Sequence, residues 1–423
     1  MAEKFEYRPG PERVQALCDL LGNPERDLRF IHIAGTNGKG STACMTASVL
    51  SEAGIRTGMF TSPAVCGVRD QYRIDGKMIG EDDYLRLLSR IDAANDILAA
   101  KRGERATPFE RDCALAFAYF SENHCDAVVL ECGMGGRDDA TNIVRNKICC
   151  VITSVSYDHM QYLGNTLYEI ASAKAGIITS DCPVVALDSS PEAMEAIEER
   201  CALTGSRLYR VKPDGISFKY TEPTGMSVSY KEFRDVRIPL TGSFQAENAA
   251  LALRTLSVIE EGGMLEGFIL NRKVLSEGLM KAVWPFRFEC LCRDPLIYAD
   301  GAHNPDAALK LRDTIEKKLA GYKIILVMGM FADKDYEQTV KILAGTASAI
   351  FTVDTPDSER ALPAVKLAET AGKFCKDVRA CAGIREAYGL AADAARDEKT
   401  AVIACGSLSY LNDFSECCIH GQG

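Results

Sequence analysis

The chain has 423 residues, of which 47% are hydrophobic and 26% are charged, and its formal net charge at pH 7 is -10. A chain of this length is too long for one hydrophobic core, so we expect two domains. The composition is that of a folded globular protein. The negative charge, with no cluster of lysine and arginine, argues against a nucleic-acid partner.

We expect neither a secretory signal nor a membrane span in this chain. Its first residues, MAEKFEYRPGPERV, lack the basic stretch and apolar core of a secretory signal, and no apolar run reaches the ~18 residues of a membrane span. The 17 cysteines are odd in number and scattered through apolar segments such as ICCVITSV, unlike a secreted disulfide framework. We therefore expect a cytoplasmic protein with no membrane partner, whose thiols are mostly buried and reduced.

The first half of the chain alternates short apolar strands with helices. We expect strands at residues 30–34, 126–133, 149–155 and 183–187, and helices at residues 41–54, 81–98 and 107–120. Residues 81–98 carry an apolar stripe made of Tyr84, Leu87, Leu88, Ile91 and Leu98. The sequence Thr107-Pro108-Phe109-Glu110 is a capping box with proline at the first helical position, which predicts where the next helix begins.

The middle of the chain has a different pattern, and the alternation then resumes. We expect short antiparallel strands at residues 216–220, 226–230 and 236–240 with a turn at 222–225, a helix at 244–261 and a linker at 281–286. Apolar strands are expected next at residues 296–300, 323–330, 349–355, 378–383 and 400–407, each followed by a helix. Alternation of this kind predicts an α/β fold with a mostly parallel sheet in both domains.

Residues 30–42, FIHIAGTNGKGST, have the pattern of a phosphate-binding loop between a strand and a helix. Gly35, Gly38 and Gly40 allow positive φ and leave backbone amides open to a ligand. Those amides and the start of the next helix point partial positive charge at one place, which suits a phosphate. Lys39 adds a full charge, and Ser41 adds a hydroxyl that can reach Mg²⁺.

The spacing differs from the common nucleotide-triphosphate loop. That loop has a glycine five residues before its Gly-Lys pair and a Ser or Thr directly after the lysine. Here Ile33 stands at the first of these positions, and Gly40 separates Lys39 from Ser41. A glycine-rich turn with an incidental lysine is the alternative interpretation, but the strand before the loop and the helix after it favour the phosphate loop.

Three further side chains follow the next strands. Glu131 ends the apolar run AVVLE, where an acidic partner of a phosphate loop holds a metal ion, although a partly exposed strand-end carboxylate is the alternative. His159 follows the strand at 149–155, where active sites of open α/β sheets collect, although many single histidines only form structural hydrogen bonds. Lys174, taken alone, is a solvated charge near a helix end.

Five segments in order resemble the folylpolyglutamate synthase and dihydrofolate synthase family of the Mur ligase superfamily. They are FIHIAGTNGKGST, FTSP, LECGMGGRDDATN, DHMQYLGNTLYEIASAKAGI and DGAHNP, and the similarity continues to GSLSYLND near the end. The resemblance implies an ATP-dependent amide ligase. ATP phosphorylates a carboxylate of folate or dihydropteroate, and the amine of L-glutamate attacks the acyl phosphate. It also implies a P-loop NTPase-like domain at residues 1–283, a Rossmann-like α/β domain at 284–423, and a monomer.

Residue roles follow from the matching motif positions. The resemblance implies that ATP is bound by Gly35, Thr36, Asn37, Gly38, Lys39, Gly40, Ser41, Thr42, Asn248, Arg287, Asp300 and His303. It implies two Mg²⁺ sites with ligands among Ser41, Ser62, Glu131, His159 and Lys174, the lysine being carbamylated. The catalytic residues on this reading are Lys39, Glu131, His159 and Lys174.

The chain departs from the family pattern at several positions. Ala64 and Val65 stand where the family usually has His-Leu, Phe244 replaces a usual histidine, and Phe286 replaces the glycine before the matched arginine. These departures concentrate where the acceptor should bind. Two alternatives therefore stay open: a related Mur-superfamily ligase that joins an amino acid to a non-folate carboxylate, and a catalytically inactive nucleotide-binding regulatory protein.

Overall fold

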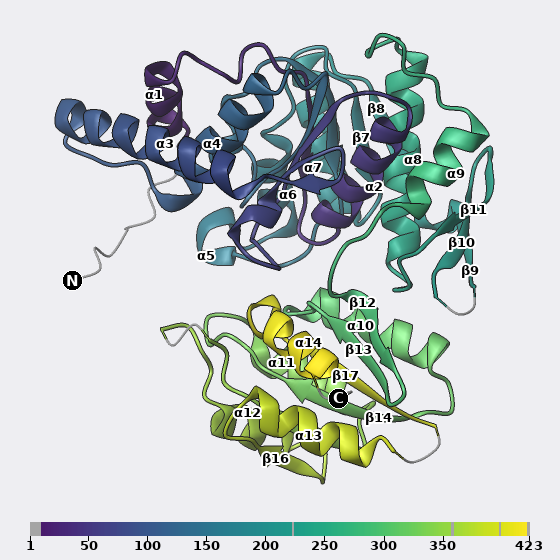
Figure 1. The fold of residues 1–423 in the computed structure, drawn as a ribbon. Helices are drawn as coiled ribbons and strands as arrows, with labels where there is room; N and C mark the ends of the chain where they lie inside the picture. Colours follow the sequence, from purple (N-terminus) through teal and green to yellow (C-terminus); the bar gives the residue numbers. More distant parts are fainter. Residues whose placement is uncertain (1–9, 222–223, 357–358, 397–398, 421–423) are drawn as a thin grey trace. The chain divides into compact units, whose positions relative to one another are not determined.

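The chain forms two compact units (Figure 1), and the computed structural model describes residues 10–221, 224–356, 359–396 and 399–420. Unit 1 comprises Met1–Phe218, Val228–Ile238 and Glu247–Ala282, and unit 2 comprises Lys219–Ser227, Pro239–Ala246 and Val283–Gly423. The predicted division into 1–283 and 284–423 stays a prediction. Residues 1–9, which belong to the segment that lacks a secretory-signal pattern, and residues 222–223 of the predicted turn lie outside the described residues.

Unit 1 is built, within the described residues, on an eight-stranded sheet of order β4-β3-β2-β5-β1-β6-β7-β8. Its strands are β1 Phe30–Ala34, β2 Thr57–Phe60, β3 Tyr72–Ile74, β4 Lys77–Met78, β5 Ala127–Glu131, β6 Lys147–Ile152, β7 Val184–Leu187 and β8 Leu208–Val211. The strands from β2 to β8 in this order pair in parallel, and β3 and β4 add an antiparallel edge. The mostly parallel sheet is confirmed, whereas β2, β3, β4 and β8 were not predicted.

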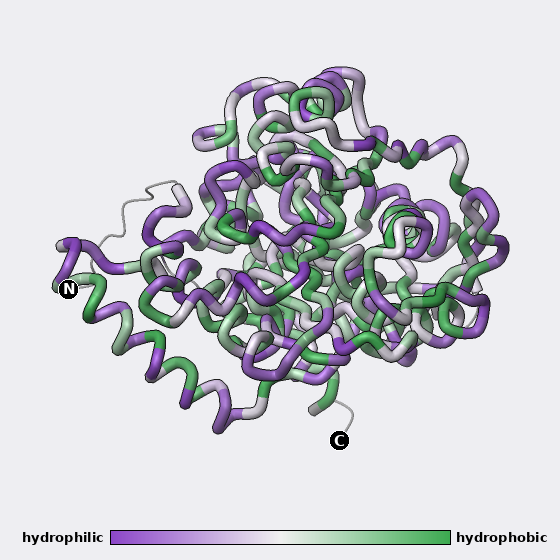
Figure 2. Tube along the Cα trace, turned by 90° about the horizontal axis from the view of Figure 1, so that it is seen from above, coloured by the Kyte–Doolittle hydropathy of each residue, from purple (hydrophilic) through white to green (hydrophobic). Residues whose placement is uncertain are grey.

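Helices cover both faces of this sheet. They are α1 Glu12–Leu20, α2 Lys39–Glu52, α3 Glu81–Arg102, α4 Pro108–Glu122, α5 Met160–Leu163, α6 Leu167–Ala175, α7 Pro191–Thr204, α8 Gln245–Glu261 and α9 Arg272–Met280. One core cluster joins α1, α3 and α4 to the sheet, and a second joins α6 and α7 to it. Leu87, Ile91 and Leu98 of α3 are buried as their spacing predicted, and hydrophobic and hydrophilic residues alternate along the helices (Figure 2).

Two capping boxes set the starts of helices in unit 1. The predicted box at α4 is confirmed, because Oγ1 of Thr107 accepts the Glu110 amide and Oε2 of Glu110 accepts the Thr107 amide. Thr166 and Glu169 form a second box, which the sequence analysis missed, at the start of α6. Since α6 carries Lys174, this box helps to fix where that lysine stands.

A small antiparallel sheet of order β11-β10-β9 was predicted from residues 214–240 and is confirmed. Its strands are β9 Ile216–Tyr220, β10 Met226–Tyr230 and β11 Phe233–Ile238. The last strand begins three residues before the predicted segment 236–240 and ends earlier, because Pro239 cannot donate to a ladder. Among the described residues, the helices lack the length and apolar character needed to cross a bilayer.

Unit 2 has a six-stranded sheet, within the described residues, of order β12-β13-β17-β14-β15-β16. Its strands are β12 Arg287–Arg293, β13 Leu296–Asp300, β14 Lys323–Met328, β15 Ala349–Thr352, β16 Val378–Ala380 and β17 Thr400–Cys405. Its helices are α10 Pro305–Lys318, α11 Tyr336–Ala344, α12 Ala364–Ala371, α13 Ile384–Ala394 and α14 Leu411–His420. The parallel strands follow the predicted alternation, and β12 is an unpredicted antiparallel strand paired with β13.

Candidate active site

The glycine-rich loop between β1 and α2 has a backbone that only glycines accommodate. Helix α2 begins at Lys39, two residues before its predicted start, so Lys39 lies in the first helical turn. Gly35 and Gly38 have φ values of +151° and +90°, a region where a side chain strains the backbone. A Cβ at Gly38 would strike Oδ1 of Asn248, and a Cβ at Gly35 would strike Oγ1 of Thr153. Backbone shape and close contacts therefore both require these glycines.

Residues that follow β6 hold the loop from one side. The amide of Thr36 donates to the carbonyl of Ser154 over 2.6 Å, and its Oγ1 donates to the carbonyl of Ser156 over 3.1 Å. The amide of Asn37 donates to Oγ of Ser154 over 3.3 Å. The amides of Thr36 and Asn37 thus have acceptors in the protein. The first turn of α2, whose N–H groups have no acceptor within a helix, is the better place for phosphate.

Lys39 connects this loop to strand β5. Its Nζ lies 3.2 Å from the carbonyl of Thr36 and 3.8 Å from Oε1 of Glu131. Glu131 is buried at the end of β5, and its register partner on β1 is Ile33, so its carboxylate lies beside the start of the loop. A buried carboxylate is costly unless a cation balances it, and Lys39 supplies that cation. The structure therefore brings together the two predicted residues.

The predicted ligands Ser41 and Ser62 lie on elements next to Glu131. Ser41 is buried in the first turn of α2. Ser62 follows β2, whose last residue Phe60 pairs with Leu130 of β5. Because neighbouring parallel strands end at the same edge of a sheet, Ser62 and Glu131 belong to one edge, where ligands bind in open α/β folds.

The loop after Ser62 has a defined shape although its sequence departs from the family pattern. The buried carboxylate of Asp70, in a 3₁₀ helix of residues Val68–Gln71, accepts the amide of Val65 over 3.0 Å and that of Cys66 over 2.6 Å. One carboxylate oxygen thus fixes two successive peptides of the loop. Asp70 was not predicted as important, because its partners are revealed only by the folded loop.

The loop after β5 packs against the ring of Phe109. A Cβ at Gly133 would lie 2.5 Å from Cζ of that ring, so the glycine is needed for the contact. Phe109 is half-buried at the start of α4. A half-buried aromatic ring beside the loop of Glu131 suits a flat heteroaromatic ligand. In the sequence, Phe109 stands out only as part of a capping box, and no pattern marks it as a site residue.

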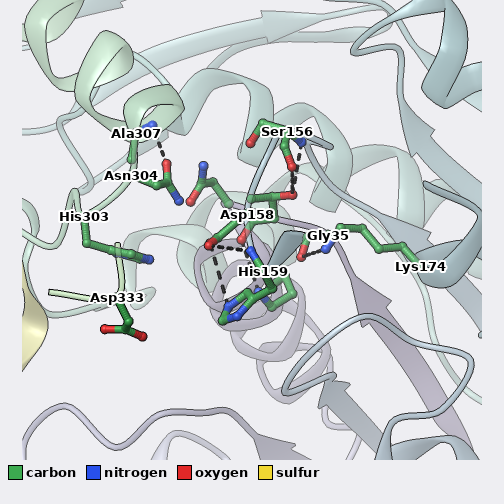
Figure 3. Close-up of polar contacts among 12 residues, drawn as sticks. Gly35, Ser156, Asp158, His159, Lys174, His303, Asn304, Ala307 and Asp333 are labelled. Atoms are coloured by element: carbon green, nitrogen blue, oxygen red, sulfur yellow. Dashed lines mark hydrogen bonds and ion pairs between the residues drawn. The ribbon is translucent and has the colours of Figure 1, made fainter. Parts of the chain in front are cut away.

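Lys174 is the most perturbed cation of the site. It lies at the end of α6, is 3% exposed, and donates from Nζ to the carbonyl of Gly35 over 3.0 Å (Figure 3). Burial and, next, the charge of Lys39 lower the pKa of Lys174 from 10.5 to about 7. The interpretation of Lys174 as a solvated helix-end charge is therefore wrong. Near pH 7 a large share of this amine is neutral and can act as a nucleophile.

His159 stands where the sequence placed it, after β6, but its neighbour Asp158 was missed. His159 has a φ of +51°, and its amide donates to Oδ1 of Asp158 over 2.9 Å while its Nε2 lies 3.8 Å from Oδ2. The charge of Asp158 acts to raise the pKa of Lys174, against the larger effect of burial. Asp158 and His159 therefore bring carboxylate and imidazole groups to the segment that also holds Thr36.

Unit 2 carries a second group of predicted residues around Asp300, at the end of β13. Its Oδ2 accepts the amide of Phe288 over 2.8 Å, and its Oδ1 accepts the amide of Ala302 over 2.9 Å. Burial raises the pKa of Asp300 to about 6, although its register partner Arg287 acts to lower it. Asp300 is therefore mostly ionised at pH 7, and each oxygen keeps a lone pair for a ligand.

Arg287 lies between two residues in left-handed conformations. Phe286 has a φ of +55° and Phe288 a φ of +52°, and both are buried. Bulky residues rarely adopt this region, and each such residue costs on the order of 1–3 kcal/mol. The amide of Phe286 donates to Oε2 of Glu289 over 2.8 Å, which helps to hold it. This conformation explains why a glycine suits the position of Phe286 in the family pattern.

His303 and Asn304 form the turn after β13. Nδ1 of His303 lies 2.8 Å from the carbonyl of Gly301, and the ring nitrogen donates in this contact because a carbonyl oxygen can only accept. Oδ1 of Asn304 accepts the amide of Ala307 and caps α10 (Figure 3). His303 is thus oriented by the backbone next to the start of a helix.

Replacing Gly38 with alanine is expected to raise KM for ATP at least ~10-fold, because the new Cβ displaces Asn248 and the strained backbone moves the first turn of α2. Gly54→Ala is the matched control, since Gly54 has a similar φ of +85° with no atom within 4 Å of a new Cβ. Steady-state kinetics and thermal melts of both variants measure this. Equal KM values for the two variants would show that the loop shape is not needed for ATP.

Two parts of the chain match known protein families. Residues 33–256 match the model of the Mur ligase middle domain, and residues 286–408 match that of the Mur ligase glutamate ligase domain. The dihydrofolate synthase/folylpolyglutamate synthase of Bacillus subtilis is 35% identical over 353 residues, covering 82% of this chain and 81% of that protein. The protein of the same name from Mycobacterium tuberculosis is 32% identical, covering 95% and 88%.

Solved structures agree with these relatives. A folylpolyglutamate synthase of Mycobacterium tuberculosis, complexed with ADP and AMPPCP, aligns with a TM-score of 0.87 at 30% identity, covering 98% of this chain and 95% of that one. Escherichia coli FolC in complex with DHPP and ADP aligns with a TM-score of 0.86 at 26% identity, covering 100% and 96%. The similarity therefore extends over both units.

Proposed function

Because this chain belongs to the Mur ligase family and to its folylpolyglutamate and dihydrofolate synthases, we propose that its residues catalyse the ATP-dependent ligation of L-glutamate to a folate-type carboxylate. The chain is an ATP-dependent ligase of this kind, with small molecules as substrates. The relatives of known structure hold ADP, AMPPCP or DHPP, and the same classes of ligand are expected here.

One observation carries the assignment of the site to unit 1. Lys39, Glu131 and Lys174 converge on a single short loop, in which Lys39 contacts Glu131 and Lys174 contacts Gly35. A regulatory protein that only bound nucleotide would have no use for a buried lysine of lowered pKa beside the loop. This observation favours an active ligase over the inactive alternative.

The proposed chemistry has two steps. A carboxylate oxygen of the acceptor attacks the γ-phosphorus of ATP, the bond to the bridging oxygen breaks, and ADP leaves. The neutral amine of glutamate then attacks the acyl carbon, its proton passes to a base, and phosphate leaves as the amide forms. Lys39 and the first turn of α2 stabilise negative charge on the transferring phosphoryl group, so this cation assists the first step most.

Magnesium fits the residues of unit 1 as an ion shared with the nucleotide. No group of three or more His, Cys, Asp or Glu side chains that could hold a metal ion occurs in the described parts of the chain. Mg²⁺ commonly uses only one or two carboxylates and completes its shell with phosphates and water. Glu131, with the hydroxyls of Ser41 and Ser62, provides such hard oxygen donors. We propose that they hold one Mg²⁺, which screens phosphate charge when bound.

A second Mg²⁺ requires Lys174 to change its charge, because an ammonium group cannot bind a cation. We propose that the neutral amine attacks the carbon of CO₂, a C–O π bond breaks, and the nitrogen loses a proton to give an anionic carbamate. The lowered pKa of Lys174, about 7, supports this reaction near neutral pH. His159 would then be the nitrogen ligand beside that carbamate.

The acceptor is the finer part of the proposal. We propose that the pterin ring stacks on Phe109 and that the loop fixed by Asp70 selects the acceptor. The assay supplies ATP, Mg²⁺ and L-glutamate with dihydropteroate, tetrahydrofolate or unrelated carboxylates, and follows phosphate release and product mass. We expect a glutamyl adduct with at least one pterin. An adduct only with another carboxylate would favour the non-folate ligase, and binding of ATP without phosphate release would favour the regulatory protein.

We further propose a cytoplasmic monomer. All 17 cysteines are free, and most are buried, which suits a reducing compartment. Light scattering of the purified protein tests the oligomeric state.

A further inference from the structure

A row of aromatic rings begins at Phe109, on which the pterin is proposed to stack. The ring centroids of Phe109 and Phe60 lie 6.2 Å apart, and those of Phe60 and Tyr72 lie 5.6 Å apart. Phe60 ends β2 and Tyr72 begins β3, and the two residues are register partners. The loop fixed by Asp70 joins these two strands, so it begins and ends at rings of this row.

Asp112 is placed against this row by two observations. The hydroxyl of Tyr72, whose ring is buried, donates to Oδ1 of Asp112 over 3.0 Å. Asp112 also follows Phe109 by three residues in α4, and side chains at this spacing are neighbours on one face of a helix, with Cβ atoms roughly 5–6 Å apart. The half-buried carboxylate of Asp112 therefore lies one helical turn along α4 from the ring of Phe109.

Two other carboxylates near Phe109 are already occupied by the protein. Glu110 accepts the amide that completes its capping box and pairs with Arg13 over 3.0 Å. Asp139, in the loop that contacts Phe109, accepts two amides and one hydroxyl from that same loop. Neither carboxylate has the spare capacity that recognition of a ligand requires.

Asp112 differs, because among the described residues it accepts a hydrogen bond from Tyr72 alone. Its neighbour Arg111 pairs with Asp92 instead. Burial raises the pKa of Asp112, although the hydroxyl of Tyr72 and the charge of Arg111 act to lower it. Since each carboxylate oxygen has two lone-pair sites, Oδ2 and one site of Oδ1 are left for a ligand.

A pterin presents an edge that matches this carboxylate. Its N3–H and its 2-amino group are adjacent donors that point in the same direction, and the two oxygens of a carboxylate can accept both at once. Hydrogen bonds to an ionised acceptor are stronger than those between neutral groups, and a paired arrangement adds geometric specificity. Because stacking on Phe109 uses the face of the pterin ring, its edge stays available for such a pair.

We propose that Asp112 determines acceptor specificity, its carboxylate accepting the N3–H and the 2-amino group of the pterin ring, and that Tyr72 positions this carboxylate. The inference rests on the proposed function and on the proposed stacking on Phe109. Stacking alone accepts any flat heteroaromatic group, whereas a few directed polar contacts supply specificity. A carboxylate in this role must discriminate between acceptors with and without the 2-amino group.

The experiment compares an acceptor with its 2-desamino counterpart, which has hydrogen in place of the 2-amino group. Dihydropteroate or tetrahydrofolate is used, whichever the wild type ligates, and kcat/KM is measured for both compounds of the pair. The wild type is expected to prefer the amino compound at least ~10-fold, because a site built to bind a donor rejects an analogue without it. Asp112→Asn should reduce that preference to within ~3-fold, since its amide nitrogen faces the ligand donors while its oxygen still accepts from Tyr72.

Two further variants sharpen the test. Asp96→Asn is the matched control, because Asp96 pairs with Arg105 at an exposed position of α3, and it should keep the wild-type preference. Tyr72→Phe keeps the buried ring but removes the hydroxyl that orients Asp112, so it should lower the preference ~3-fold. The KM for ATP should stay unchanged in all three variants. Circular dichroism and thermal melts establish which variants fold.

A folded Asp112→Asn variant that keeps the wild-type preference would overturn the inference, even if kcat/KM falls equally for both compounds, because equal losses indicate a structural role. A wild type without a preference would overturn it as well. If Asp112→Asn does not fold, Tyr72→Phe decides by the same ratio. A wild type that ligates glutamate to no pterin would reject the proposed function and this inference together, whereas failure of the inference alone leaves the wild type active on its pterin.

Discussion

Lys39→Ala is expected to lower kcat/KM for ATP by ~10³-fold or more, roughly 4 kcal/mol of transition-state stabilisation, while the protein stays folded. The Nζ of Lys39 lies 3.8 Å from Glu131 and 3.2 Å from the carbonyl of Thr36, at the turn where phosphate is expected. Negative charge on the phosphoryl oxygens must be neutralised as ATP reacts. The substitution also leaves the buried Glu131 without its cation, so some loss of stability should accompany the larger catalytic defect.

Phosphate release and thermal melts measure the two effects separately. Lys101→Ala, at an exposed position of α3, is the control for removing a lysine and should keep wild-type activity. The charge of Lys39 lowers the pKa of Lys174, so removing Lys39 would raise that pKa and disfavour the proposed carbamate. The assay should therefore contain saturating bicarbonate. Activity of Lys39→Ala within a few-fold of the wild type would show that the loop does not bind the reacting phosphates.

The features that the sequence predicted well are those that neighbouring residues determine. The strand, loop and helix at residues 30–42 follow from an apolar run, glycines and a helix start, all within one short segment. The capping box of Thr107 and Glu110 requires only four consecutive residues, and it forms as expected. The apolar stripe of α3 was also predictable from neighbouring residues, because helical spacing places Leu87 and Ile91 on one face of the helix, which packs against the core.

The features that were missed depend on residues far apart in the chain. Lys174 was interpreted as a solvated charge because helix-end lysines are usually exposed, and its contact with Gly35 spans 139 residues. Asn142 and Lys147 carry no signal of their own, since their hydrogen bonds to the carbonyls of Gly176 and Ile177 arise only when the loop after β5 meets the end of α6. Strand β12 was missed for a different reason: it pairs in antiparallel with β13, and the expected alternation of parallel strands and helices does not include such a strand.

Lys174→Ala is expected to lower turnover ~10²- to 10³-fold, with recovery of part of the activity when a short carboxylate such as acetate or propionate is added. The reason is that the proposed carbamate supplies an anionic oxygen ligand, which a small carboxylate can replace in the space left by the side chain. Lys174→Arg is the discriminating control. Arginine keeps a cation at the position but cannot form a carbamate, so it should be as inactive as alanine and should not respond to carboxylates.

The pH dependence adds an independent check on Lys174. Since its pKa is about 7 in the folded protein, the neutral amine is scarce at pH 6 and dominant at pH 8. At limiting CO₂, wild-type activity should therefore rise as pH increases through 7, and saturating bicarbonate should flatten that rise. Removal of CO₂ by degassing should slow the wild type but not the carboxylate-rescued Lys174→Ala variant. An active Lys174→Arg enzyme would mean that this lysine acts through its positive charge, and the carbamate would then have to be abandoned.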